Sequence, residues 1–195
     1  LIVFPHGGPH ARDAQYFDPY VQYFASRGYA VLQVNFRGST GFNNEHTRAG
    51  YREWGQAMQE DVYDAIDWLA GQNLVDTGRA CVVGASYGGY VALTAAYQRP
   101  KQFKCIVSIS GVSDLVEMIE TSLLYEETIG ISYKETVGDI WDGEQKQRLR
   151  DNSPISHVDE MRAPILLVHG TYDTQVRVKQ SVDFNSKAVF AGLDI

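Results

Sequence analysis

Short apolar runs alternate with amphipathic stretches along the whole chain, and this alternation constrains the possible folds more than any other feature of the sequence. It is typical of parallel β-strands joined by helical crossovers, with helices on both faces of the sheet. The sequence therefore predicts an α/β fold with a mostly parallel sheet. Five apolar runs are expected to be its strands: residues 1–4, 29–35, 80–84, 105–110 and 165–169.

Helical spacing links apolar residues between these runs. Four of them, between the first two runs, recur at i, i+3, i+4 and i+7: Phe17, Tyr20, Val21 and Phe24. Gly28 is expected to end this helix, because glycine readily adopts the left-handed conformation found at many helix ends. Further helices are predicted over 60–72 and 89–97. Three valines predict the apolar face of a last helix: Val178, Val182 and Val189.

The composition suits one globular domain and argues against several partners. The chain has 195 residues, 44% of them hydrophobic, which is enough to bury a core and too apolar for disorder. A net charge of −7 with scattered basic residues argues against a nucleic-acid partner. No apolar run approaches the ~20 residues that cross a bilayer, so no membrane partner is expected. No segment resembles a signal peptide, which leaves the compartment open with a slight preference for the cytoplasm.

The two cysteines, Cys81 and Cys105, lie in apolar runs expected to be central strands. Neither belongs to a C-x-x-C motif or to a Cys/His metal-binding pattern. We expect buried free thiols, with a disulfide or a reactive thiol as the alternatives.

The strongest local motif is G-A-S-Y-G at residues 84–88, between an expected strand and an expected helix of small residues. G-x-S-x-G in this context is typical of a nucleophile elbow, in which a sharp strand-to-helix turn exposes the serine hydroxyl. Ser86 is therefore the candidate nucleophile. The backbone N–H of the next residue, Tyr87, is a candidate donor to an oxyanion.

A second motif, P-H-G-G-P at residues 5–9, follows the first expected strand. Its two glycines allow the backbone to approach a reacting carbonyl closely, and the N–H of Gly8 is the preferred second oxyanion donor. His6 is expected to hold this turn through hydrogen bonds, rather than to act as a general base.

A third motif, H-G-T-Y-D at residues 169–173, follows the last expected strand. A carboxylate there can accept the Nδ1 hydrogen of an imidazole and orient it, so Asp173 is the candidate acid of a catalytic triad. The alternative is a loop carboxylate that caps the helix beginning near Val178.

The third member of such a triad is not found in the chain. α/β hydrolases order their triad as Ser, Asp and His, and none of the five histidines follows Asp173. The base is therefore expected beyond residue 195. Because the chain begins at Leu1 without an initiator Met, the fold is expected to be incomplete at both ends.

Residues 113–153 show no clean periodicity and carry ten acidic against four basic residues. A long connection after a strand, at the sheet edge where such folds bind ligands, is a candidate cap or specificity segment. A solvated helical excursion without substrate contact is the alternative.

Taken together, the motifs resemble the catalytic domain of the prolyl oligopeptidase family of serine peptidases, nearest its acylaminoacyl-peptidase-like and dipeptidyl-peptidase-like members. The resemblance covers nearly the whole chain. It rests on blocks in the same order: H-G-G-P at 6–9, R-G-Y-A-V at 27–31, N-F-R-G-S-T-G at 35–41, W-G at 54–55 with E-D at 60–61, S-Y-G-G-Y at 86–90, S-P at 153–154, and H-G at 169–170 with Asp173.

The resemblance implies an α/β-hydrolase fold over residues 1–195, with Ser86 as nucleophile, Asp173 as triad acid, and the N–H groups of Gly8 and Tyr87 as the oxyanion hole. It also implies an apolar substrate pocket walled by two valines, Val112 and Val176. It implies an N-terminal β-propeller in the same polypeptide, a small peptide substrate, and no metal or organic cofactor. Gln175 stands where prolyl-specific members carry an arginine, which argues against proline specificity.

The expected function is that of a serine peptidase that hydrolyses short peptides through a Ser-Asp-His triad and an acyl-enzyme. Without the histidine, residues 1–195 alone are expected to be inactive. A carboxylesterase or thioesterase with the same residues is one alternative, and a non-catalytic hydrolase-fold binding module is another. The sequence leaves oligomerisation open.

Overall fold

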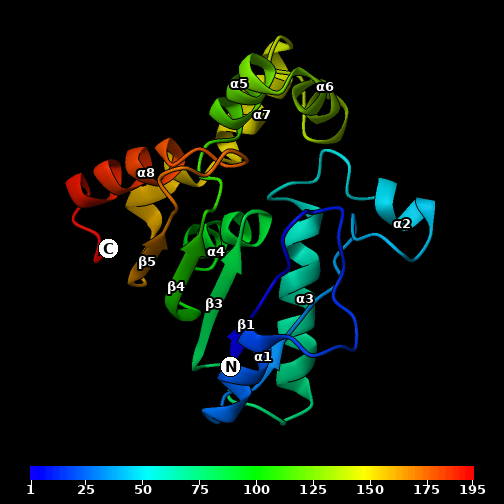
Figure 1. The fold of residues 1–195 in the computed structure, drawn as a ribbon. Coiled ribbons are helices and arrows are strands. Elements are labelled where there is room, and N and C mark those ends of the chain that lie inside the picture. The colour runs from blue at the N-terminus through cyan, green and yellow to red at the C-terminus, as the bar shows by residue number, and fades with distance from the viewer.

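The computed structural model describes all 195 residues, which form one five-stranded parallel sheet in the order β2-β1-β3-β4-β5 (Figure 1). Each expected strand is present, and all four strand pairs are parallel. The strands are β1 (Ile2–Val3), β2 (Val31–Leu32), β3 (Ala80–Ala85), β4 (Phe103–Ile109) and β5 (Ile165–Val168). The first two are much shorter than predicted, because their apolar runs continue into irregular backbone that carries the turns around Gly8 and Gly38.

Helices lie on both faces of the sheet (Figure 1). α4 (Tyr87–Gln98) packs against β3 and β4 and is buried from Tyr87 to Tyr97, while α3 (Ala57–Gly71) packs beside it. α1 (Pro19–Ser26) lies on the opposite face, where it borders an apolar groove over Cys81, Val83 and Val107. α8 (Lys179–Phe190) packs against β5, and α2 (Asn44–Arg48) is a short outlying helix.

The glycines around Ser86 let α4 approach the sheet closely. A Cβ added at Gly84 would lie 2.2 Å from the carbonyl oxygen of Gly88, and one at Gly89 would lie 2.7 Å from the Cα of Gly111. Any larger residue would force the helix away from β3 and β4. The small residues of the elbow are therefore required by packing as well as by the turn.

Residues 113–153 form three helices at the carboxyl ends of the strands, above the sheet in Figure 1. They are α5 (Leu115–Tyr125), α6 (Glu127–Thr136) and α7 (Gly143–Asp151), and η1 (Pro154–Glu160) follows them. Asp114 and Asp142 cap α5 and α7 by accepting backbone N–H bonds. None of the chain's helices combines the length and the apolar composition needed to cross a membrane.

The expectation of free thiols is wrong. Cys81 and Cys105 form a disulfide between β3 and β4, where they are directly opposite one another with their Cα atoms 4.7 Å apart. The sequence does not reveal this pairing, because the two residues lie on different strands separated by all of α4.

The predicted face of the last helix is also wrong. Val182 and Val189 are 54% and 59% exposed, whereas the buried residues of α8 are Gln180, Ser181, Phe184 and Ala188. Two polar residues occupy the buried face because partners in the chain satisfy their hydrogen-bonding groups.

Candidate active site

Ser86 lies between the end of β3 and the start of α4 with φ 56° and ψ −120°. This left-handed φ is costly for a residue other than glycine, so the surrounding structure must hold it in place. Its N–H donates to the carbonyl of Ile109 over 2.9 Å, and its carbonyl accepts from the N–H of Tyr90. The half-buried side chain forms no hydrogen bond within the chain, which leaves its hydroxyl free to react.

The turn at residues 6–9 lies directly against this elbow. A Cβ added at Gly7 would lie 3.1 Å from the carbonyl oxygen of Ala85 and 3.5 Å from the Cβ of Ser86. Gly8 has φ +127°, a value that favours glycine. The structure therefore brings Gly8 and Ser86, which are far apart in the sequence, to the same edge of the sheet.

His6 holds this turn from behind. Its Nδ1 donates to the carbonyl of Gly7 over 2.8 Å, its Nε2 accepts from the hydroxyl of Ser39, and its ring stacks on Phe36 at 4.4 Å. Burial lowers the pKa of His6 despite the Gly7 hydrogen bond and the nearby Asp13, which favours the neutral ring. His6 makes no hydrogen bond to Ser86.

The side chain of Tyr87 lies in a buried aromatic cluster beneath the turn. Its ring packs against Trp54 at 4.5 Å and Phe36 at 5.2 Å between centroids. Its hydroxyl is buried without a hydrogen-bond partner, and burial raises the pKa of Tyr87 well above the usual value. The side chain thus anchors the first residue of α4, whereas the candidate oxyanion donor is its backbone N–H.

Asp173 lies in the loop after β5, where its carboxylate orders the residues that follow. Its Oδ1 accepts from the N–H groups of Gln175 at 2.9 Å and Val176 at 3.0 Å. Burial opposes its ionisation, but hydrogen bonds from Val176, the Ser110 hydroxyl and Gln175 outweigh it, so the pKa of Asp173 is lowered. Asp173 does not cap α8, whose N-terminal Val178 has no side-chain cap.

The end of β4 connects the two candidate catalytic side chains. Ile109, the last residue of β4, accepts the N–H of Ser86, and the hydroxyl of the neighbouring Ser110 contributes to the lowered pKa of Asp173. Ser110 also donates its N–H to Val168 on β5 over 2.7 Å. Parallel strands end at the same edge of the sheet, and this register places Ser86 and Asp173 on either side of β4.

No histidine of the chain completes a triad. His169 is closest to Asp173, with 3.9 Å between Nε2 and Oδ2, but its Nε2 donates to the carbonyl of Val176 and its Nδ1 accepts from Ser181. His46 and His157 donate to backbone carbonyls, and His10 lies edge-on to Tyr51. None of the five hydrogen-bonds Ser86.

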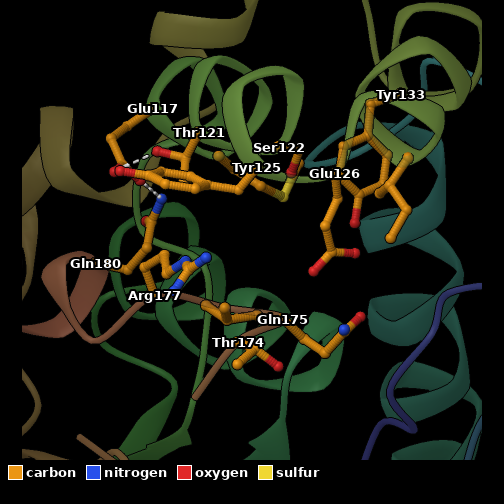
Figure 2. Close-up of a pocket in the computed structure, with 13 residues that line it drawn as sticks. Glu117, Thr121, Ser122, Tyr125, Glu126, Tyr133, Thr174, Gln175, Arg177 and Gln180 are labelled. Carbon is orange, nitrogen blue, oxygen red and sulfur yellow. Dashed lines mark hydrogen bonds between the residues drawn. The ribbon is translucent and has the colours of Figure 1, made fainter. Parts of the chain in front are cut away.

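A narrow pocket lies beside Asp173, between α5, α6 and the loop that leads into α8 (Figure 2). Val176 lines it, but Val112, the other predicted wall, is buried at 2% exposure and is not part of the lining. The segment 113–153 is the predicted specificity segment, but no motif in the sequence marks which residues of α5 and α6 line the pocket. Glu126 extends into the cavity, and the Arg177 guanidinium lies 4.7 Å from the ring centre of Tyr125.

No cluster of three or more His, Cys, Asp or Glu side chains is arranged to hold a metal ion. The groups that face the site are a free hydroxyl, an oriented carboxylate and backbone N–H groups. Such a set is suited to acyl transfer by a serine nucleophile.

A nucleophile elbow on a parallel sheet with helices on both faces defines the α/β-hydrolase fold. Within this class, the model described as "Prolyl oligopeptidase family" matches residues 15–192, and the chain belongs to that family.

Three known proteins illustrate the similarity. The chain is 39% identical over 185 residues to "Dipeptidyl peptidase family member 6" of Caenorhabditis elegans, covering 94% of the chain and 25% of that protein. It is 38% identical over 181 residues to "Dipeptidyl aminopeptidase BIII" of Pseudoxanthomonas mexicana, covering 93% and 26%. A puromycin-hydrolyzing peptidase of Mycobacterium tuberculosis superposes with a TM-score of 0.91 at 31% identity, covering 98% and 28%. The chain thus spans about a quarter of the length of the curated relatives it matches.

Proposed function

We propose that the full-length protein is a serine peptidase that cleaves short peptides, with Ser86 as its nucleophile. The observation that carries the proposal is the left-handed φ of Ser86 at a strand-to-helix turn, with the Gly7–Gly8 backbone packed against it. The family membership and the dipeptidyl peptidase names of two relatives support a peptide rather than a simple ester as substrate.

In the proposed mechanism, Ser86 Oγ attacks the scissile carbonyl while a histidine takes up its proton. The N–H groups of Gly8 and Tyr87 stabilise the tetrahedral oxyanion. Its collapse breaks the C–N bond, and the histidine returns the proton to the departing amine. Water then hydrolyses the acyl-enzyme by the same steps and releases Ser86.

The histidine of this mechanism is proposed to come from outside residues 1–195. The rings of His6 and His169 have both nitrogens engaged with other groups, and none of the chain's histidines bonds Ser86. Asp173 would accept the Nδ1 hydrogen of the incoming ring through Oδ2, because Oδ1 already accepts two backbone N–H groups.

Residues 113–153 are proposed to be the specificity segment, since α5 and α6 line the cavity beside Asp173. Val176 lines this cavity. Val112 does not line it, but it lies in the segment between β4 and α5. Both valines stay predicted substrate contacts. An N-terminal β-propeller in the full-length protein also stays a proposal, supported by relatives about four times as long as this chain.

Labelling with a fluorophosphonate, followed by intact mass and peptide mapping, tests the nucleophile. The full-length protein should gain one adduct at Ser86, and Ser86→Ala should gain none. Ser186→Ala, a change at an exposed serine of α8, is the matched control and should label like the wild type.

Peptide cleavage separates the enzyme classes. The untreated full-length protein should hydrolyse dipeptidyl or N-acylated aminoacyl amides, with activity lost in Ser86→Ala and after fluorophosphonate treatment. Cleavage of esters without any cleavage of amides would favour the carboxylesterase alternative, and a folded full-length protein that stays unlabelled would contradict the proposal.

A further inference from the structure

Gln180, in the first turn of α8, is only 3% exposed although its side chain is polar. Its Oε1 accepts from the N–H groups of Ser113 and Asp114, both over 2.7 Å. Its Nε2 donates to the carbonyl of Asp114 at 2.9 Å and to the carboxylate of Glu117 at 2.5 Å. Both ends of the carboxamide are therefore fully used.

These bonds join two segments that line the cavity from different sides. Glu117 belongs to α5, and it also accepts from Thr121 on the next turn. Gln180 follows the Asp173 loop, whose Val176 carbonyl accepts from His169. The Ser113 hydroxyl donates to the backbone carbonyl of Gln180 over 2.8 Å, so the connection is also made through the main chain.

We infer that Gln180 is a positioning residue, which sets the separation between α5 and the Asp173–Arg177 loop and thereby the width of the substrate cavity. The inference rests on the proposed function, because it assigns this cavity to the substrate. Gln180 touches no reacting atom in the proposed mechanism; it acts through the residues that line the cavity.

Only a carboxamide satisfies all of these groups. Methionine at this position would leave the Ser113 and Asp114 N–H groups and the Asp114 carbonyl buried without partners. Glutamate would still accept from the two N–H groups, but it would offer no proton to Asp114 and would face the carboxylate of Glu117. Each change should loosen α5 relative to the loop.

The design uses the full-length protein with Gln180→Glu, Glu117→Gln and the double variant. The double variant exchanges donor and acceptor, so that an amide at position 117 faces a carboxylate at position 180. Asn185→Asp, which adds the same charge at an exposed position of α8, is the matched control.

Two kinetic readouts separate positioning from catalysis. Gln180→Glu should raise KM about ten-fold for peptides with a large residue before the scissile bond, the loss expected for one charge-assisted hydrogen bond. Its rate of labelling by a small fluorophosphonate should stay within about two-fold of wild type. The double variant should recover most of the KM, and Asn185→Asp should match the wild type.

Amide hydrogen exchange measures the positioning independently of catalysis. Exchange in peptides spanning 111–118 and 173–178 should rise together in Gln180→Met and in Gln180→Glu, while exchange in α3 stays unchanged. In the double variant it should return from the Gln180→Glu level toward that of wild type. Unchanged exchange in the folded Gln180→Met variant would overturn the inference, and so would a KM defect that the double variant does not recover. A wild type that is unreactive at Ser86 would instead refute the proposed function, and the exchange data would still test the positioning role.

Discussion

At the scale of single residues, hydrogen bonds to the backbone hold both candidate catalytic residues in place. Ser86 is kept in a left-handed conformation by its bonds to Ile109 and Tyr90. Asp173 orders its own loop through two N–H groups before it meets any histidine. The two candidate catalytic residues are therefore oriented by hydrogen bonds as well as by the sheet.

Tyr87→Phe tests whether the Tyr87 side chain has any role beyond packing. The hydroxyl is buried without a partner, so its removal should leave the free energy of unfolding unchanged or raise it by about 1 kcal/mol. Fluorophosphonate labelling of Ser86 should be unchanged, because the backbone N–H remains. Urea unfolding measures the free energy of unfolding, and labelling kinetics measure the reactivity of Ser86. A large loss of stability or of labelling rate would show that the Tyr87 hydroxyl has a role beyond packing.

Asp173→Asn tests the carboxylate through its pH dependence. The folded pKa lies below the ordinary 3.8, so the stability that Asp173 contributes is present above about pH 4 and is lost as the pH falls through the folded pKa. The free energy of unfolding should therefore fall less in Asp173→Asn than in wild type between pH 5 and 2. At neutral pH the variant should also lose activity, on the order of 10³–10⁴-fold in kcat. Parallel acid titrations of the two proteins would contradict this expectation.

At the scale of elements, close helix-to-sheet packing and one covalent link hold β3 and β4 in register. α4 contacts both strands through glycines, and the disulfide joins the same strands on the opposite face. Because Ser86 lies where β3 meets α4, a change in the helix packing or in the disulfide should shift the position of its side chain.

Gly89→Ala should push α4 away from β4. The new Cβ would lie 2.7 Å from the Cα of Gly111 and 2.8 Å from the hydroxyl of Ser108, which is costly in a packed core, about 1–3 kcal/mol. Thermal unfolding should show this loss, with slower labelling of Ser86. Gly71→Ala at the end of α3 is the control, since a Cβ there meets nothing within 4 Å; it should be neutral or slightly stabilising. Equal effects of the two substitutions would refute the packing argument.

The Cys81–Cys105 bridge should be detectable by mass. Alkylation with iodoacetamide under denaturing, non-reducing conditions should modify neither residue, and prior reduction should expose both. Closing a loop of 24 residues should stabilise the fold by about 3 kcal/mol, so Cys105→Ala should lower the free energy of unfolding by up to that amount. Alkylation of both thiols without reduction would show that the bridge is absent in solution.

At the scale of the whole molecule, the two faces and the two edges of the sheet differ in what covers them. α4, with α3 beside it, covers β3 and β4 on one face, whereas α1 leaves an apolar groove on the other. β2 and β5 are the edge strands, as expected from the order of the sheet. On β5, Leu166 and Val168 are 55% and 47% exposed.

Residues 1–195 expressed alone should therefore self-associate through the edge strand β5, which carries the exposed Leu166 and Val168. Exposed apolar edge strands pair readily with other chains. Leu166→Lys combined with Val168→Lys should reduce the association, and Val182→Lys with Val189→Lys on exposed α8 is the matched control. Sedimentation velocity over a range of concentrations measures it. A monomer at all concentrations, or equal improvement in both double variants, would contradict the role of β5.

The sequence by itself determined the class of fold and singled out the candidate residues of the site. Hydrophobic periodicity located every strand and four helices, α1, α3, α4 and α8, but not α5, α6 and α7. Three local motifs singled out Ser86, Gly8 and Asp173 as candidates, because turns that expose reactive groups need specific residues next to each other. Periodicity and short motifs involve residues close together in the chain, so they can be recognised without knowing which distant residues pack against them.

Only the tertiary structure decided what depends on neighbours distant in sequence. Cys81 faces Cys105 because β3 and β4 are adjacent, and Gln180 is buried because Ser113, Asp114 and Glu117 satisfy it. Periodicity assigned the wrong face to α8 for the same reason: it counts apolar side chains, whereas burial depends on which groups find partners. The cavity beside Asp173 likewise exists only where α5 and α6 meet the loop before α8, which no local pattern records.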